Sequence, residues 1–250
     1  MDVTLSWSEM PWLRLGAYLF LSTFVLGNIA TWLRTRRGWH DGYTRKLNHF
    51  GHMAISTPLL AFLPPAQLLP AVVVGAIAVV LIYGVAAISK RPWVHGIVAG
   101  SLRDRDAPRS RFFFFLPLIT GNIALLVAVL AFPLDAVRVA FFTVAFADGF
   151  AEPIGIRFGQ STIYRVPDLL WSGSNTKSIA GSSAVFVWAL LIAATMLWLT
   201  GADIATIAIV AVAYAAIVAT IEALSPRGLD NMLLLAACPP ILMALMEVAT

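Results

Sequence analysis

The sequence contains little charge and almost no cysteine. Only 12% of its 250 residues are charged and 60% are hydrophobic, whereas about 25% of residues are charged in an ordinary soluble domain. Cys238 is the only cysteine, which excludes a disulfide framework and a thiolate metal site. The apolar stretches leave no gap for a soluble domain, and we find no internal repeat. These absences indicate an integral membrane protein, and we expect no nucleic acid among its partners.

Apolar stretches of about 20 residues, the length that crosses roughly 30 Å of hydrocarbon, recur along the chain. We expect an all-α, polytopic bundle of about eight transmembrane helices that forms one membrane-embedded domain over residues 1–250. The first span is not expected to be a cleaved signal, because Asp2 and Glu9 precede it in place of a basic cluster. The predicted spans are 12–33, 47–63, 68–88, 112–132, 134–156, 179–200, 204–224 and 232–248.

Basic residues lie mainly on one side of this predicted bundle. All of the 17 Lys and Arg residues except Arg14 and Arg138 follow spans one, three, five or seven. Because cytoplasmic loops accumulate basic residues, we expect both termini outside and these basic loops in the cytosol. Attraction to anionic lipid would explain the same pattern. A bacterial inner membrane is the expected location, and an organelle membrane would follow the same charge rule.

The stretch AFADGFAEPIGIRFG, residues 145–159, places two carboxylates inside a predicted span. A carboxylate at the bilayer centre costs about 2.5–3.5 kcal/mol, so Asp148 and Glu152 need a polar partner or a function. Their spacing of four puts them on one helical face, where they repel unless a cation lies between them. Arginines of neighbouring helices could equally satisfy them.

A proline interrupts the same span. Pro153 lacks an N–H and crowds the carbonyl of Gly149, so we expect the helix to kink or break and a polar cavity to open here. Gly155 and Gly159 could form only a packing face between helices.

A second stretch, TRKLNHFGHM at residues 44–53, opens span two with polar side chains beside Lys46. These positions recur at steps of four, three and four and share one helical face: Arg45, His49, His52 and Ser56. Two histidines could bind a metal, but no third nitrogen ligand is evident, so a stripe facing phosphate or carboxylate is expected. The alternative is a set of hydrogen-bonded structural histidines.

Two further stretches add a cation, acids and an amide. GSNTKSIAGSSAVF, residues 173–186, brings Lys177 to the start of a predicted helix, where free N–H groups and the helix dipole favour a phosphate. Thr176 stands where a Walker A loop has glycine, so that motif is excluded. The alternative is an ordinary cap by Ser174 or Asn175. IEALSPRGLDNML, residues 221–233, adds Glu222, Asp230 and Asn231.

Four pieces of these stretches, RKLNHFGHM, ADGFAEPIGIRFG, KSIAGSSAVF and IEALSPRGLDN, resemble the phytol kinase and dolichol kinase family of CTP-dependent polyprenol kinases. In their order and residue identities they are most similar to the phytol kinase branch. The resemblance implies transfer of the γ-phosphoryl group of CTP to an isoprenoid alcohol, such as phytol or geranylgeraniol, with Mg²⁺ at the cytosolic face. Leu229 and Ala180 depart from the family pattern, which leaves the acceptor alcohol open.

We expect the site to combine residues from all four stretches. Asp148, His49 and Lys177 are the expected catalytic residues, with Asp148 or His49 as proton acceptor. The resemblance implies Asp148, Glu152 and Asp230 as metal ligands. The expected nucleotide contacts are Arg45, Lys46, Gly149, Lys177, Ser178, Gly181 and Asn231.

Three other functions remain open. A CDP-diacylglycerol synthase would carry a Lys-Asp pair and a His-Gly-Gly segment, whereas Ser178 follows Lys177 and no His-Gly-Gly occurs. A CTP-dependent diacylglycerol kinase ranks between that synthase and the polyprenol kinase. A secondary transporter also uses broken helices and intramembrane carboxylates, but its site usually lies near the midplane between repeats.

Overall fold

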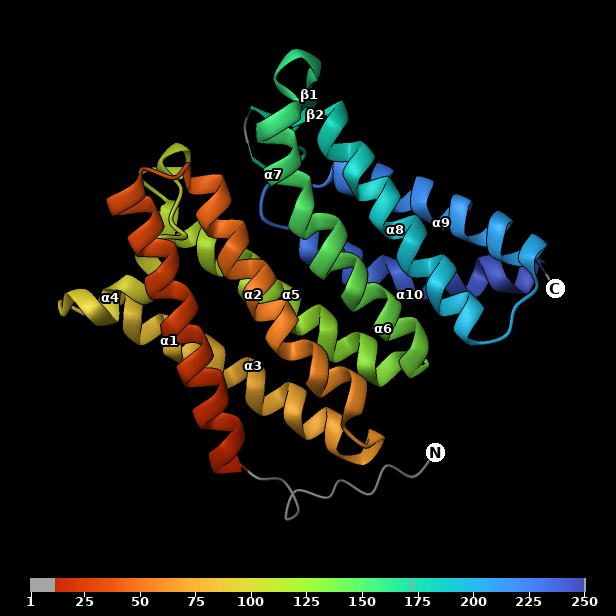
Figure 1. The fold of residues 1–250 in the computed structure, drawn as a ribbon, viewed down its shortest axis with the longest axis horizontal. Helices are drawn as coiled ribbons and strands as arrows, with labels where there is room; N and C mark the ends of the chain where they lie inside the picture. Colours follow the sequence, from red (N-terminus) through yellow and green to blue (C-terminus); the bar gives the residue numbers. More distant parts are fainter. Residues whose placement is uncertain (1–11, 172, 250) are drawn as a thin grey trace. The chain divides into compact units, whose positions relative to one another are not determined.

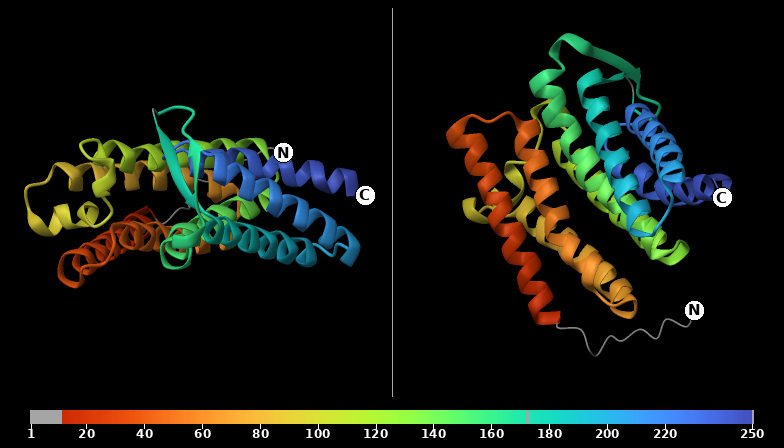
Figure 2. Two further views of the ribbon diagram at one scale, coloured as in Figure 1. Left: turned by 90° about the horizontal axis from the view of Figure 1, so that it is seen from above. Right: turned by 45° about the vertical axis from the view of Figure 1, so that its right-hand side comes forward.

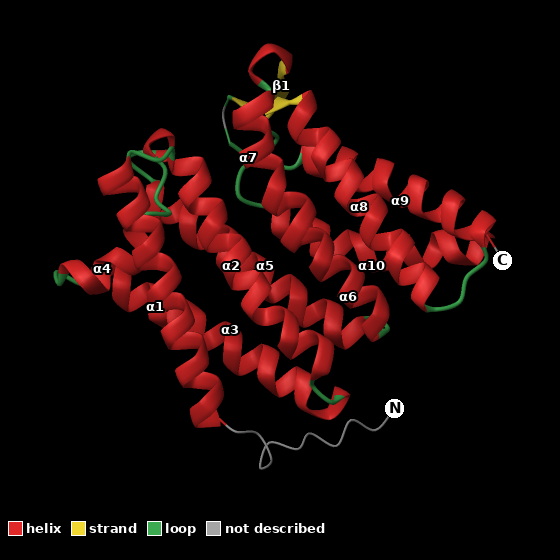
Figure 3. Cartoon of the chain, in the orientation of Figure 1, coloured by secondary structure: helices red, strands yellow, loops and turns green. Residues whose placement is uncertain are grey.

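The computed structural model describes residues 12–171 and 173–249, and most of these residues are helical (Figures 1 and 3). Within these ranges, seven helical segments are long and apolar enough to cross a membrane. The chain is therefore a multi-pass integral membrane protein with an all-α bundle architecture. Two compact units make it up, one ending at Ile119 and one beginning at Thr120.

The first unit packs around its short fourth helix. α1 contacts α2, α3 and α4, and α3 also contacts α4. Tyr83, Ala86 and Val98 are buried where α3 meets α4. The helices of this unit are α1 (Trp12–Arg37), α2 (Asp41–Phe62), α3 (Pro65–Ile88), α4 (Pro92–Ala99) and the first part of α5 (Ser110–Ala131).

The second predicted span is a helix, but it is less apolar than the others. α2 begins at Asp41, six residues before the expected start, and it is not among the seven apolar segments. Its apolar part begins only at Leu47, so at 1.5 Å per residue that part measures roughly 24 Å, less than the hydrocarbon thickness. The charged first turns of α2 therefore belong at a membrane surface.

The second unit is a closely packed helical bundle. α7 contacts α8, α8 contacts α9, α9 contacts α10, and α10 contacts α6. Small buried residues such as Ala140, Ala189 and Ala215 line these contacts and let the helices approach closely. Its elements are the rest of α5, α6 (Leu134–Phe142), α7 (Gly149–Phe158), α8 (Ile179–Leu199), α9 (Ile204–Leu224) and α10 (Asp230–Ala249).

The acidic span is irregular at its centre. A π-helical segment, η3 (Thr143–Asp148), joins α6 to α7. The irregularity expected at Pro153 thus lies about one turn earlier, directly before Gly149. Pro153 lies inside α7, where its missing N–H leaves the carbonyl of Gly149 without its usual helical partner. A widened turn is one way in which helices accommodate such a site.

A β-hairpin connects α7 to α8 through a short 3₁₀ turn, η4 (Gln160–Thr162). Its strands β1 (Ile163–Pro167) and β2 (Ser174–Ser178) pair antiparallel. Figure 2 (right) shows the hairpin crossing the ends of α7 and α8 toward the α9–α10 loop. The predicted cap by Ser174 or Asn175 is wrong, because both residues lie on β2.

Candidate functional site

Lys177 lies at the centre of a polar cluster in the second unit. Its Nζ donates to the backbone carbonyl of Glu222 at 3.0 Å and to Oε1 of the same residue. Glu222 lies in the last turn of α9, and its side chain is 5% exposed, whereas that of Lys177 is 20% exposed. The hairpin therefore brings a cation to the buried acidic end of α9.

Two further carboxylates act on the same lysine. Burial lowers the pKa of the Lys177 ammonium, and the carboxylate of Glu222 raises it. Asp230 and Asp148 raise the pKa further, so that it lies above its ordinary value of 10.5. Lys177 is consequently protonated near neutral pH. Three acidic residues from three separate elements therefore act on one ammonium group.

Asp148 reaches this cluster from the irregular segment of the acidic span. It is the last residue of η3 and is only 3% exposed, so its carboxylate lies within the protein and not against lipid. Gly149 follows as the first residue of α7 and is buried. Glu152 lies almost one turn further along and is half-buried. The π-helical turn thus delivers a carboxylate to the interior, as such turns often do at functional sites.

Asp230 and Asn231 begin α10. Oδ1 of Asp230 accepts a hydrogen bond from the backbone N–H of Asn231 at 3.1 Å. The Asn231 side chain is buried, and its Oδ1 has no hydrogen-bond partner. Because buried acceptors are nearly always paired, a ligand that donates a hydrogen bond or supplies a cation would satisfy this oxygen.

Ser178 and nearby glycines form the contact between α7 and α8. Oγ of Ser178 accepts the N–H of Gly181 at 3.1 Å, so Ser178 is the cap of α8. A Cβ on Gly181 would lie 2.9 Å from the carbonyl oxygen of Ala151, and one on Gly155 would lie 2.8 Å from Oγ of Ser178. Close packing accounts for these residues. Phosphate contacts from Ser178 and Gly181 stay predictions.

The carboxylates of the cluster are too few to hold a hard cation alone, so a substrate would have to supply further ligands. In the described part of the chain, no three Asp, Glu, His or Cys side chains converge to hold a metal ion. Mg²⁺ usually takes one or two carboxylates and completes its octahedron with water and substrate phosphates. Asp148 and Asp230, which both act on Lys177, fit that donor set. A metal contact from Glu152 stays a prediction.

The remaining predicted residues lie on α2, in the first unit. Arg45 and His49 are half-buried and Lys46 is buried. His52, from the same predicted stripe, bonds into the core: its Nε2 lies 2.7 Å from the hydroxyl of Tyr83. The structural alternative is therefore confirmed for His52, while nucleotide roles for Arg45, Lys46 and His49 stay predictions.

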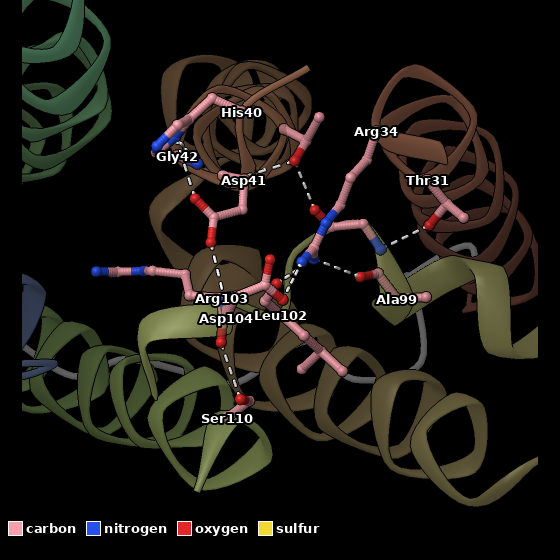
Figure 4. A network of polar contacts seen from close by, with 12 residues as sticks. Thr31, Arg34, His40, Asp41, Gly42, Ala99, Leu102, Arg103, Asp104 and Ser110 are labelled. Atoms are coloured by element: carbon pink, nitrogen blue, oxygen red, sulfur yellow. Dashed lines mark hydrogen bonds and ion pairs between the residues drawn. The ribbon is translucent and has the colours of Figure 1, made fainter. Parts of the chain in front are cut away.

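A polar network fixes the neighbouring ends of α1 and α2 (Figure 4). Arg34 donates to the carbonyl of Ala99 at 3.1 Å and pairs with the carboxylate of Asp104 at 2.6 Å. The N–H of Asp104 in turn donates to Asp41, the first residue of α2, at 3.0 Å. These bonds join the loop after α4 to both helices. Arg34, Asp41 and Asp104 thus have partners within the protein, so their charges do not indicate a ligand site.

No family model, curated protein or solved structure matches this chain. The residues and their geometry therefore carry the functional interpretation. The sequence analysis assigns no role to Glu222, which the structure places in the polar cluster. A carboxylate in the last turn of an otherwise apolar span is itself a signal for a buried partner, and that partner is Lys177.

Proposed function

We propose that this chain is a CTP-dependent lipid kinase that transfers the γ-phosphoryl group to the hydroxyl of an isoprenoid alcohol. The observation that carries the proposal is the contact of Lys177 with the buried Glu222, in a cluster where Asp148 and Asp230 also raise the pKa of the lysine. These groups come from three separate elements, and a triphosphate with its divalent ion requires such a mixture of carboxylates and cations. The four stretches that resemble the phytol kinase and dolichol kinase family support CTP as the donor.

In the proposed reaction, the alcohol oxygen attacks the γ-phosphorus, the bond from that phosphorus to the β–γ bridging oxygen breaks, and CDP leaves. An ammonium group has three N–H donors, and Lys177 gives two of them to Glu222. The third can hold a phosphate oxygen in a direction that Glu222 fixes. Asp148 accepts the proton of the alcohol, and His49 is the second candidate for that role.

Mg²⁺, when bound by Asp148 and Asp230, would neutralise charge on the phosphate oxygens. The unpaired Oδ1 of Asn231 offers a further acceptor in the same short segment of α10. We propose that the site faces the cytosol of a bacterial inner membrane, because basic residues concentrate in the loops on that side. The isoprenoid tail would remain in the bilayer among the apolar helices.

The test uses purified protein in detergent with a prenol, Mg²⁺ and CTP labelled at either the γ- or the α-phosphorus. Label that reaches lipid only from the γ position supports the kinase, and Lys177→Ala and Asp148→Asn should each abolish the transfer. Asp135→Asn is a matched control, since Asp135 pairs with Arg138 at the other end of the same span. Transfer from the α position to added phosphatidate would instead show a cytidylyltransferase, and no transfer to prenol, diacylglycerol or phosphatidate would leave transport.

A further inference from the structure

The hairpin between α7 and α8 is fastened to the α9–α10 loop by two residues at its tip. Nε1 of Trp171 donates to the carbonyl of Arg227 at 3.0 Å. The N–H of Arg227 donates to Oδ2 of Asp168 at 3.2 Å. Both backbone groups of one loop residue are thus held by the hairpin, and we call this arrangement of Asp168, Trp171 and Arg227 the latch.

Further contacts continue the latch along β2. Nδ2 of Asn175 donates to the carbonyl of Ser225 at 3.3 Å, and Lys177 then contacts Glu222. Positions along the hairpin therefore meet positions 227, 225 and 222 in succession. The hairpin forms a strap across this end of the second unit (Figure 2, right).

Hydrogen bonds within the turn that follows Asp168 orient its carboxylate toward the loop. Its Oδ1 accepts the N–H groups of Leu170 at 3.2 Å and Trp171 at 3.0 Å, while Oδ2 is directed to the loop. Burial raises the pKa of this carboxyl, but the N–H groups of Trp171, Leu170 and Arg227 outweigh it and leave the pKa below its ordinary value of 3.8. The carboxylate is therefore ionised, and able to accept all of these bonds, near neutral pH.

We infer that Asp168 and Trp171 are positioning residues that hold Lys177 in the acidic cluster. Lys177 follows the hairpin tip on β2, and Asp230 lies three residues after Arg227 on the opposite side of the latch. The latch therefore fixes the positions of two members of the cluster, Lys177 and Asp230, that are far apart in sequence. The role of Lys177 at a phosphate rests on the proposed function, whereas the strap itself does not.

The strap can be tested without any substrate by labelling lysines with an amine-reactive acetylating reagent in the full-length protein. The chain has three lysines: Lys90 is exposed and serves as the internal reference, Lys46 is buried and reports on folding, and Lys177 reports on the strap. Mass spectrometry then gives the labelling rate of each lysine.

In Asp168→Ala and in Trp171→Phe, the labelling rate of Lys177 relative to Lys90 should rise about fivefold, as expected for the loss of the one hydrogen bond to Arg227 that each change removes. Asp203→Ala is the matched control, because Asp203 accepts two backbone N–H bonds in the same way but at the opposite end of α9. Its Lys177 rate should equal that of the wild type. A wild-type rate at Lys177 in both latch variants, with Lys46 still protected, would overturn the inference.

The CTP assay separates this inference from the proposed function. In both latch variants the KM for CTP should rise about fivefold while the KM for the prenol stays constant, because the latch positions Lys177 and Asp230, which are proposed to hold the phosphates and the metal ion and not the alcohol. If Lys177 is labelled faster in the latch variants but the wild-type protein transfers no phosphoryl group, the strap is supported and the proposed kinase function is excluded. If the wild-type protein transfers the phosphoryl group but the latch variants label Lys177 at the wild-type rate, the kinase function is supported and the strap is excluded.

Discussion

Nζ of Lys177 donates to both the backbone carbonyl and the side-chain carboxylate of Glu222. A single glutamate therefore determines the direction of the only lysine in the second unit. Asp148 and Asp230 act on the same ammonium from the ends of η3 and α10. The stability of this unit and the phosphate binding proposed for it should consequently depend on the same few side chains.

Breaking the Lys177–Glu222 pair should destabilise the protein more than removing it altogether. Lys177→Met leaves Glu222 buried without its cation, and the free energy of unfolding should fall by about 3 kcal/mol. The double variant Lys177→Met/Glu222→Gln should lose less than the sum of the two single variants, because Glu222 then no longer carries a buried charge without its cation. Unfolding by SDS in mixed micelles measures these values, and additive losses would mean that the pair is not coupled.

Asp148→Asn and Asp230→Asn should each weaken binding of a divalent ion in the presence of CTP. Each change removes one carboxylate from a site that has few, so the affinity for Mn²⁺ should fall at least about tenfold. Electron paramagnetic resonance of free Mn²⁺ gives that affinity without a catalytic assay. Asp135→Asn should bind Mn²⁺ like the wild type, and equal affinities in all of these variants would exclude the proposed ligands.

Gly181→Ala should act on packing. Its new Cβ would lie 2.9 Å from the carbonyl oxygen of Ala151, so α7 and α8 must separate, at a cost of about 1–3 kcal/mol in the free energy of unfolding. Gly84→Ala is the matched control: Gly84 also lies in a helix, and a Cβ there would meet no atom within 4 Å. That variant should be neutral or slightly more stable. Equal effects of the two changes would contradict the close contact.

The stability of the hairpin that forms the strap should not depend on pH until the solution becomes acidic. A lowered pKa at Asp168 means that its ionised form stabilises the hairpin above the ordinary pKa of an aspartate, and that this contribution is lost as the pH falls through the lowered value. Hydrogen-exchange protection of the hairpin amides, corrected for intrinsic rates, should stay constant from about pH 8 to pH 5 and fall below about pH 4. In Asp168→Asn this acid limb should disappear; a limb near neutral pH would point to another group.

The proposed orientation can be tested with single cysteines. Cys238 is buried, and its replacement by alanine gives a background free of cysteine. Leu169 and Ile204 are exposed, at the hairpin and at the opposite end of the bundle. In intact bacteria a membrane-impermeant maleimide should label Ile204→Cys, whereas Leu169→Cys should react only after permeabilisation. The opposite pattern would place the cluster outside the cytosol.

Most of the spans could be predicted from sequence, because the length of an apolar stretch sets the length of a membrane helix; the exception is 47–63, whose helix is not among the seven long apolar segments of the described residues. The predicted span 204–224, for example, coincides with α9 (Ile204–Leu224). The sequence also draws attention to Asp148, Lys177 and Asp230, because charge inside or beside an apolar segment is costly; their roles in a site stay predictions.

The hairpin could not be predicted in the same way. β2 has the sequence SNTKS, which lacks the alternation of apolar and polar residues that marks a strand. Contacts with residues 222, 225 and 227 stabilise it, and such distant partners leave no local pattern. The pairing of Lys177 with Glu222 is hidden for the same reason.

The order of the cluster along the chain also constrains biosynthesis. Lys177 is translated 45 residues before Glu222, and Asp230 comes later still, so at about 5–20 residues per second the lysine waits several seconds for its partners. A nascent chain released before α10 would contain the Lys177–Glu222 pair but lack Asp230 and the helix that packs on α6 and α9. Ribosomal stalling or truncation in this interval should therefore yield a product that quality-control proteases remove.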